Sequence, residues 1–348
     1  HYGTSSFDSK SNINIQNIGL AGTFESGTST GWLSANLGIA YNRMGSFKSK
    51  QTIQGVNTES TLLDAHKSKI EANNFDKFGS GLSWGLYIID TINGKLITGF
   101  PNFNETQTKT IDRSGGMSET AFSFGGNYEN RFYLGATLGF ANVRFKEASS
   151  YLEIGAPSDT VKPIKVKSFT YNEALTTIGS CFNLKLGAIY RLNDYVRLGG
   201  AVHTPTFYSL SDNYSTEMSA TGTMVNGRDT TYTTKSPTGN FNYNLATPFK
   251  AIASAAFIFG QHGLISADYE FVNYSLARLG AQQVNGYSFQ KENQNIQTRY
   301  KPSGNVRVGA EYRIDMFTLR AGYAHYGNPY SSIVANVMKN NTVTLGFG

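Results

Sequence analysis

Apolar and polar residues alternate along this chain in repeated segments of about ten residues. From Phe132 to Phe140 every second residue is apolar. The intervening positions are small or polar: Tyr133, Gly135, Thr137 and Gly139. Because successive side chains of a β-strand point to opposite faces, the segment is predicted to be a strand with one apolar face. The same pattern recurs along the chain, mostly in pairs joined by short polar turns.

The alternation predicts an all-β, antiparallel chain of eleven strands with two kinds of connection. The strands are expected at 12–25, 31–44, 119–128, 131–146, 168–191, 195–208, 247–260, 264–276, 298–314, 318–326 and 342–348. Long connections rich in Ser, Thr and Asn are expected near 147–167, 209–246, 277–297 and 327–341. Short turns at one end and long loops at the other are typical of a transmembrane β-barrel, on its periplasmic and extracellular sides respectively.

Residues 45–117 are predicted to begin and end on the extracellular side, because the strands around them enter and leave short turns. This excursion contains the apolar stretch GLSWGLYIID, and it is expected to form either an extra pair of strands or a folded cap. A second excursion is expected at 209–246. Residues 1–348 are otherwise interpreted as one barrel domain.

The second face of the strands distinguishes a membrane barrel from a soluble sandwich or lipocalin-like barrel, whose apolar faces point inward. Charged residues on this face are Lys185, Arg191, Arg197, Asp268, Glu270, Arg307, Glu311, Arg313 and Arg320. A dry interior would not accommodate so many charges, whereas a water-filled lumen would. Aromatic residues also gather beside the short turns, as in the interfacial girdle of a membrane barrel.

Composition agrees with this interpretation. Charged residues make up 16% of the chain and aromatic residues 13%. No apolar run approaches the length of a membrane-spanning helix. The single cysteine, Cys181, excludes an internal disulfide, and the net charge of +6 is scattered, which gives no indication of nucleic-acid binding.

The strand count suggests an incomplete barrel. Eleven is odd, whereas bacterial single-chain barrels have even numbers of strands. The sequence ends at Phe347-Gly348, shortly after a new alternation has begun. We therefore expect a fragment that lacks an N-terminal segment and the last strands.

Three segments carry a resemblance to a known family. FSFGGNYENRFYLGATLGF, LKLGAIYRLNDYVRLGGAVHTPTFYSLSD and VRVGAEYRIDMFTLRAGYAHYGNPY resemble the FadL-type outer-membrane transporters of long-chain fatty acids and other hydrophobic compounds, in particular a branch often labelled haemin receptor. The resemblance implies fourteen strands, an N-terminal plug, and a lateral opening in the third strand. The plug motif is absent here, and the third strand corresponds to 31–44, where Gly38 is a candidate distortion point, although ordinary packing is the simpler explanation for it.

The resemblance also implies an extracellular groove that captures hydrophobic ligands. The dense apolar cluster in the first excursion is a candidate for it, with the core of a folded loop as the alternative: Leu82, Trp84, Leu86, Tyr87, Ile88 and Ile89. The charged lumen residues named above would either bind a fatty-acid carboxylate or form structural ion pairs. The histidines, His1, His66, His203, His262 and His325, show no metal-ligand spacing, and axial haem ligation is a minor alternative. No nucleophile-and-base motif was found, so no enzyme activity and no cofactor are expected.

Two functions are expected from different classes. The first is passive transport of hydrophobic small molecules, such as long-chain fatty acids, across the outer membrane of a Gram-negative bacterium. The second is a scaffold role in a complex with other outer-membrane proteins, with the long loops as contact surfaces. A general porin fits the charged lumen but not the resemblance. The expected surroundings are the lipid bilayer and lipopolysaccharide.

Overall fold

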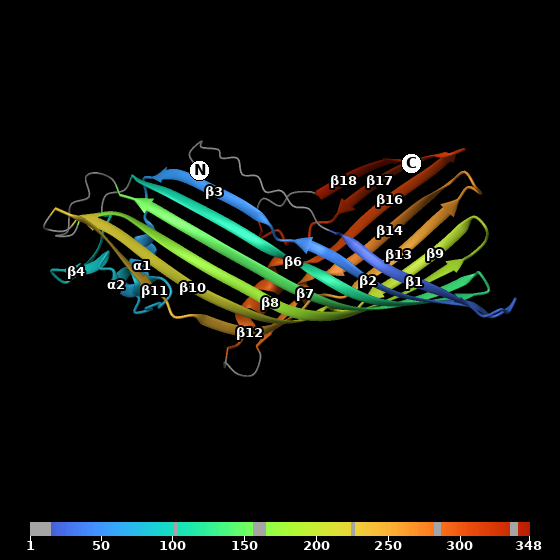
Figure 1. The fold of residues 1–348 in the computed structure, drawn as a ribbon, viewed down its shortest axis with the longest axis horizontal. Coiled ribbons are helices and arrows are strands. Elements are labelled where there is room, and N and C mark those ends of the chain that lie inside the picture. The colour runs from blue at the N-terminus through green and yellow to red at the C-terminus, as the bar shows by residue number, and fades with distance from the viewer. Residues whose placement is uncertain (1–14, 101–103, 156–164, 224–226, 282–286, 335–339) are drawn as a thin grey trace.

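The computed structural model describes residues 15–100, 104–155, 165–223, 227–281, 287–334 and 340–348. Its main feature is a single curved antiparallel sheet (Figure 1). Eleven strands form the continuous path: β1 (Asn17–Glu25), β2 (Trp32–Ser46), β6 (Glu105–Tyr128), β7 (Phe132–Ile154), β8 (Lys165–Arg191), β9 (Val196–His203), β13 (Lys250–Ile258), β14 (Gly263–Asn273), β16 (Pro302–Ile314), β17 (Phe317–Tyr326) and β18 (Asn340–Phe347). The all-β antiparallel prediction is confirmed, and each of the eleven predicted strands overlaps one strand of this path.

Further strands extend the sheet at one end. They are β3 (Ser49–Asn57), β10 (Phe207–Thr223), β11 (Asp229–Lys235), β12 (Gly239–Ala246) and β15 (Arg278–Ala281). Beside this end lie α1 (Leu62–Glu71), α2 (Ser80–Gly85) and the separate hairpin of β4 (Ile89–Ile92) and β5 (Lys95–Thr98). A short 3₁₀ helix, η1 (Tyr274–Leu276), and α3 (Gln290–Arg299) precede β16. In the described residues, no helix is both long and apolar enough to cross a membrane.

The prediction of long loops at 147–167 and 209–246 is wrong over most of those residues. β7 continues to Ile154, β8 already begins at Lys165, and the second excursion forms β10, β11 and β12. Threonine and serine, which suggested loops, here pair side by side across strands, as Thr221 does with Thr231 at 2.8 Å between hydroxyl oxygens. Residues 12–14, 156–164, 224–226, 282–286 and 335–339 of the predicted strand and connections lie outside the described residues.

The apolar pattern inverts along the long strands. On one face of β7, Phe140 is 46% exposed and ends a run of apolar side chains, and the next residues on that face are Asn142, Arg144 and Lys146. On the opposite face the change is reversed. Glycine and threonine line it in the first half of β7, whereas Tyr151 in the second half packs against an apolar core. The sheet is therefore apolar outside over one half and apolar inside over the other. We call the first half the band and the second half the extension.

The first excursion, 45–117, contains both an added strand and a folded cap, the two structures expected as alternatives. β3 pairs with the first half of β6 and so adds a strand. Residues 61–100 form a small cap that packs against the inner face of the extension. The shared core consists of Leu63, Leu82, Ile88, Ile89, Phe100, Val166, Phe169, Tyr171, Met218 and Ala220. Figure 1 shows the cap helices beside β10 and β11, at the end of the sheet away from the short turns.

The cap begins with a well-formed helix start. The Thr61 side chain accepts a hydrogen bond from the amide of Leu63, and the Asp64 carboxylate accepts one from the amide of Thr61. Such a capping box satisfies two backbone donors that the first turn leaves without partners. It fixes α1 at the point where the chain turns from the sheet into the cap.

Three neighbouring strands are interrupted at the same height. β9 and β10 are separated by Thr204-Pro205-Thr206, β12 and β13 by Thr247-Pro248-Phe249, and β14 and β15 by η1. Proline cannot donate to a strand ladder, so the pairing stops at each proline. Threonine side chains bridge the gap, because Thr204 Oγ1 accepts from the amide of Leu184 and Thr247 Oγ1 accepts from the amide of Thr206. The predicted strands 195–208, 247–260 and 264–276 are thus each interrupted at the end that lies away from the short turns.

Candidate functional site

The polar face of the band carries a charged cluster that joins three strands. Glu119 on β6 is 3% exposed, and its carboxylate accepts hydrogen bonds from Lys185 Nζ at 2.7 Å and Asn183 Nδ2 at 3.0 Å, both on β8. β7 lies between these strands and contributes Gly139 at this position, whose lack of a side chain lets the carboxylate pass over it. The sequence spacing of Glu119 alone did not reveal this cluster.

A second cluster lies on β14 and β16. The Glu270 carboxylate accepts from Asn305 Nδ2 at 2.7 Å and from Arg307 Nη2 at 3.3 Å. The guanidinium of Arg307 also lies over the ring of Tyr326, 5.9 Å from its centroid. Glu270 and Arg307 were predicted from the sequence, and the structure places them in one ion pair.

A basic row lies between the two clusters. Lys185, His203 and Lys250 are paired in register on β8, β9 and β13 and therefore share the polar face. Among the described residues, Lys250 forms no ion pair within 4.0 Å. Sequence reasoning missed His203 and Lys250 as site residues, although Lys250 lies in phase with Ile252 and Ser254 on the polar face.

The remaining predicted charges lie nearer the short turns. Arg191 pairs with Asp194 at 2.6 Å, and Glu311 pairs with both Arg313 and Arg320 at 2.8 Å. Arg197 and Asp268 form no ion pair with another described residue. With Lys185, which pairs with Glu119, seven of the nine charges predicted on this face are therefore held by structural partners. Within the described residues, Arg197 is the predicted arginine without a carboxylate partner.

The wall next to the basic row is built from very small residues. Gly135, Gly187, Gly199 and Ala201 contribute to a hollow of about 510 Å³ that also includes Lys185 and His203. The register pairs Gly135 with Gly187 and Gly187 with Ala201. The small size of these residues leaves space in front of the charged groups.

The apolar cluster predicted as a capture groove divides into three sets. Leu82 and Ile89 are buried in the core that the cap shares with the extension. Leu86, Tyr87 and Ile88 line a groove of about 440 Å³ whose other wall comes from β10 and β11, including Ala220 and Tyr232. Trp84 is 38% exposed but lies outside the lining of this groove.

Tyr87 adopts a backbone conformation that is unusual for its type. Its φ of 56° lies in the left-handed region, which bulky residues rarely occupy. It follows the end of α2, where its amide donates to the carbonyl of Trp84 at 3.0 Å. The conformation leaves the side chain 66% exposed at the groove. Backbone strain of this kind often accompanies a functional position.

Gly38 lies in a regular part of β2. It pairs with Ala21 on β1 and Ser123 on β6, and the ladder shifts register only further along, between Trp32 and Ser34 and between Arg43 and Gly45. A Cβ at Gly38 would meet its neighbours at ordinary contact distances of 3.7 Å or more. Gly38 also lines a shallow apolar hollow, together with Leu20, Leu37 and Phe122.

The histidines do not gather. Among the described residues, no group of three or more His, Cys, Asp or Glu side chains is placed to hold a metal ion. His66 Nδ1 lies 2.6 Å from Ser83 Oγ inside the cap core, and burial, together with nearby Lys69, lowers the pKa of His66 to about 4. His1 lies outside the described residues.

The fold and its faces define an antiparallel sheet of the class that forms transmembrane barrels, with an apolar outer band and a charged inner face. Among solved structures, the chain is similar to the Pseudomonas putida toluene transporter TodX, at 11% identity and a TM-score of 0.39, over 95% of this chain and 78% of that one. It is also similar to the Ralstonia pickettii toluene transporter TbuX, at 11% identity and a TM-score of 0.37, over 86% of this chain and 70% of that one. No family model and no curated protein matches the chain.

Proposed function

We propose that this chain is a passive transporter of hydrophobic small molecules in the outer membrane of a Gram-negative bacterium. The observation that carries the proposal is the groove between the cap and the β10–β11 hairpin. Leu86, Tyr87 and Ile88 line it from one side and Tyr232 from the other. Exposed apolar grooves of this size are typical of small-molecule sites.

The band supports a place in the membrane. Its apolar side chains are exposed on strand after strand, which water would disfavour and hydrocarbon would not. Aromatic pairs lie beside the short turns, for example Trp32 with Tyr128 at 5.4 Å and Tyr195 with Phe257 at 6.4 Å between ring centroids. Interfacial aromatic residues of this kind flank the hydrocarbon layer in membrane barrels.

The inner face supports a ligand that carries an acid group, as long-chain fatty acids do. Arg197 and Lys250 are cationic groups without an ion pair among the described residues, and they lie on either side of the glycine-lined hollow. A carboxylate would form charge-assisted hydrogen bonds with either group. A neutral hydrocarbon such as toluene, which TodX and TbuX transport, would use the same path without these bonds.

Release through the wall near Gly38 is a further part of the proposal. The apolar hollow beside Gly38 lies among the exposed apolar side chains of the band. A ligand that left the barrel there would therefore enter hydrocarbon. Gly38→Ala tests this step, since the added methyl group fits the static wall and would hinder only a local widening of the ladder.

The proposal is tested by uptake of radiolabelled palmitate and toluene into liposomes that contain the purified chain. We expect uptake of both compounds, and we expect Leu86→Asn to reduce both because it places an amide in the groove. Trp84→Ser is the matched control, since Trp84 is an exposed apolar residue outside the groove. Equal uptake by empty liposomes would refute transport. A protein that copurifies stoichiometrically, without any small ligand, would favour the scaffold function.

A further inference from the structure

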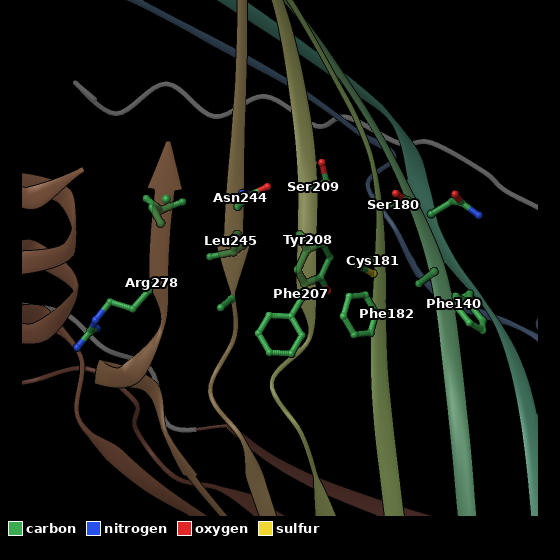
Figure 2. Close-up of a pocket in the computed structure, with 15 residues that line it drawn as sticks. Phe140, Ser180, Cys181, Phe182, Phe207, Tyr208, Ser209, Asn244, Leu245 and Arg278 are labelled. Atoms are coloured by element: carbon green, nitrogen blue, oxygen red, sulfur yellow. The ribbon is translucent and has the colours of Figure 1, made fainter. Parts of the chain in front are cut away.

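The outer face of the sheet has a hollow at the boundary between the band and the extension. Its cavity volume is about 670 Å³, and Figure 2 shows the residues that line it on β7, β8, β10, β12 and β15. One row across these strands is paired in register and therefore shares a face: Phe140, Phe182, Phe207, Ala246 and Arg278. The row consists of three aromatic residues, one methyl group and one guanidinium.

The hollow arises from the change in side-chain size along this row. Phe182 and Phe207 lie with ring centroids 5.3 Å apart, and Phe207 is 45% exposed. The next residue in the row, Ala246, fills little space, and Gly280 on β15 has no side chain. A gap therefore opens between the ring of Phe207 and the stem of Arg278.

The next row towards the extension is polar. It contains Asn142, Ser180, Ser209, Asn244 and Gly280. The hollow thus lies where an apolar surface meets hydrogen-bonding groups. In a membrane barrel this height corresponds to the interface between acyl chains and headgroups.

Arg278 is held in place at the rim of the hollow. Its Nη1 donates hydrogen bonds to the carbonyls of Ser275 and Ala277, both at 2.7 Å. The Nε and Nη2 groups form no hydrogen bond or ion pair with another described residue. The free side of the guanidinium matches the geometry of phosphate oxygens.

Within the described residues, the far edge of β15 contacts α3 and pairs with no further strand. Asn293 on α3 accepts from the amide of Leu279 and donates to its carbonyl, both at 2.8 Å. Because β15 is fixed on both sides, Arg278 occupies a defined position relative to Phe207. The site is therefore built from five strands, with α3 supporting the last of them, and it does not depend on a single surface loop.

We infer that this hollow binds a phosphate-bearing lipid of the outer leaflet, with an acyl chain against Phe182 and Phe207 and the phosphate at Arg278. The inference rests on the membrane placement of the proposed function, but not on transport itself. A membrane lipid is favoured over a transported ligand because the row belongs to the outer, apolar face of the band.

The test is native mass spectrometry of the purified chain in mild detergent with added lipid A, phosphatidylglycerol or phosphatidylcholine. We expect retention of lipid A and phosphatidylglycerol, whose phosphates leave the lipid with a net negative charge, above that of phosphatidylcholine, whose phosphate is balanced by its own choline cation. We also expect about a tenfold loss of lipid A retention in Arg278→Gln, because one charge-assisted contact is removed. Ala246→Leu, which fills the hollow, should cause a similar loss. Arg299→Gln, at the end of α3, is the matched control and should retain lipid like the unmodified chain.

Three outcomes would overturn the inference. They are equal retention by Arg278→Gln and Arg299→Gln, displacement of the lipid by palmitate at equal concentration, and full competition by inorganic phosphate alone. Palmitate displacement would assign the hollow to a transported acid, and phosphate competition would reduce it to a simple anion site. Palmitate uptake, measured in parallel, separates the two proposals: lipid retention without uptake would refute transport and leave this site intact.

Discussion

Glu119 on β6 and Lys185 on β8 form an ion pair of 2.7 Å across the strand that separates them. The carboxylate is nearly inaccessible to solvent, while the lysine side chain is 27% exposed. The attraction within such a pair contributes little net stability. Removing one partner is costly, however, because the other charge is then left buried without a counter-ion.

The first prediction concerns this pair. Lys185→Met should destabilise the sheet by about 3 kcal/mol, since it leaves a buried carboxylate without its cation. The double variant Glu119→Gln/Lys185→Met should recover most of the loss. Urea unfolding in detergent, followed by electrophoretic mobility, measures both. Lys235→Met, which removes an exposed pair with Glu217, is the control and should leave stability nearly unchanged. A double variant as unstable as the single one would contradict the explanation.

The second prediction concerns pH. Burial lowers the pKa of His66 to about 4 from an ordinary value of 6.5, so the folded cap requires the neutral imidazole. The unfolded cap binds a proton as pH falls through 6.5, and the folded cap does so only near pH 4. Cap stability is therefore complete above pH 6.5 and is lost progressively down to pH 4, by about 3 kcal/mol.

Hydrogen exchange of α1 amides at pH 7 and pH 4.5, corrected for intrinsic rates, measures this loss. His66→Asn should remove the dependence. His262→Asn, in an exposed turn, should not affect it. Identical protection of α1 at both pH values in the unmodified chain would refute the prediction.

The third prediction concerns Tyr87. Asparagine tolerates the left-handed region better than tyrosine, so Tyr87→Asn should leave the cap equally stable or more stable, by up to about 1 kcal/mol. Palmitate uptake should nevertheless fall, because an exposed ring is lost from the groove. Tyr232→Ser should lower uptake without any gain in stability, since Tyr232 lies in an ordinary strand. Loss of stability in Tyr87→Asn would show that the ring serves packing.

The fourth prediction distinguishes acids from hydrocarbons. Arg197→Gln should reduce palmitate uptake severalfold and leave toluene uptake unchanged, because only the carboxylate uses the charge. Arg313→Gln is a suitable control, since Arg313 already forms an ion pair with Glu311. Equal losses for palmitate and toluene would indicate a structural effect of Arg197.

The fifth prediction tests the inversion of the apolar pattern along β7. Leu138 lies on the outer face within the band, and Ser150 lies on the same face within the extension. Leu138→Arg should cost about 2–4 kcal/mol of folding free energy in lipid bilayers, because it places a charge in hydrocarbon. Ser150→Arg should change stability by less than about 0.5 kcal/mol. Similar costs at the two positions would place the membrane boundary elsewhere.

The strands of the band were predictable from the sequence because each is exposed to one uniform environment on each face. The run from Phe132 to Phe140 has a period of two for this reason. The extension was not predictable, since its inner face meets the cap and its outer face meets water. Tyr151, Phe169 and Met218 belong to the cap core, and nothing in their local spacing indicates which distant segment covers them.

The candidate site divides in the same way. Arg307 and Glu270 were predictable, because charges on alternating positions mark the inner face. The partners of Glu119 were not, since Asn183 and Lys185 lie on a strand two positions away in the sheet. The six groove candidates could not be told apart from the sequence. Leu82 is buried in the cap core and Leu86 lines the groove, yet both lie in one short apolar segment and differ only in the direction of their side chains.

The cap core also implies an order of assembly. Ser83 donates a hydrogen bond to the sulfur of Met218, a residue 135 positions later in the chain. Residues 61–100 must therefore wait, with apolar side chains uncovered, until β8 and β10 have been placed beside them, and contacts between such distant segments form slowly. A closed cap therefore requires that β8 and β10 have already been placed in the sheet.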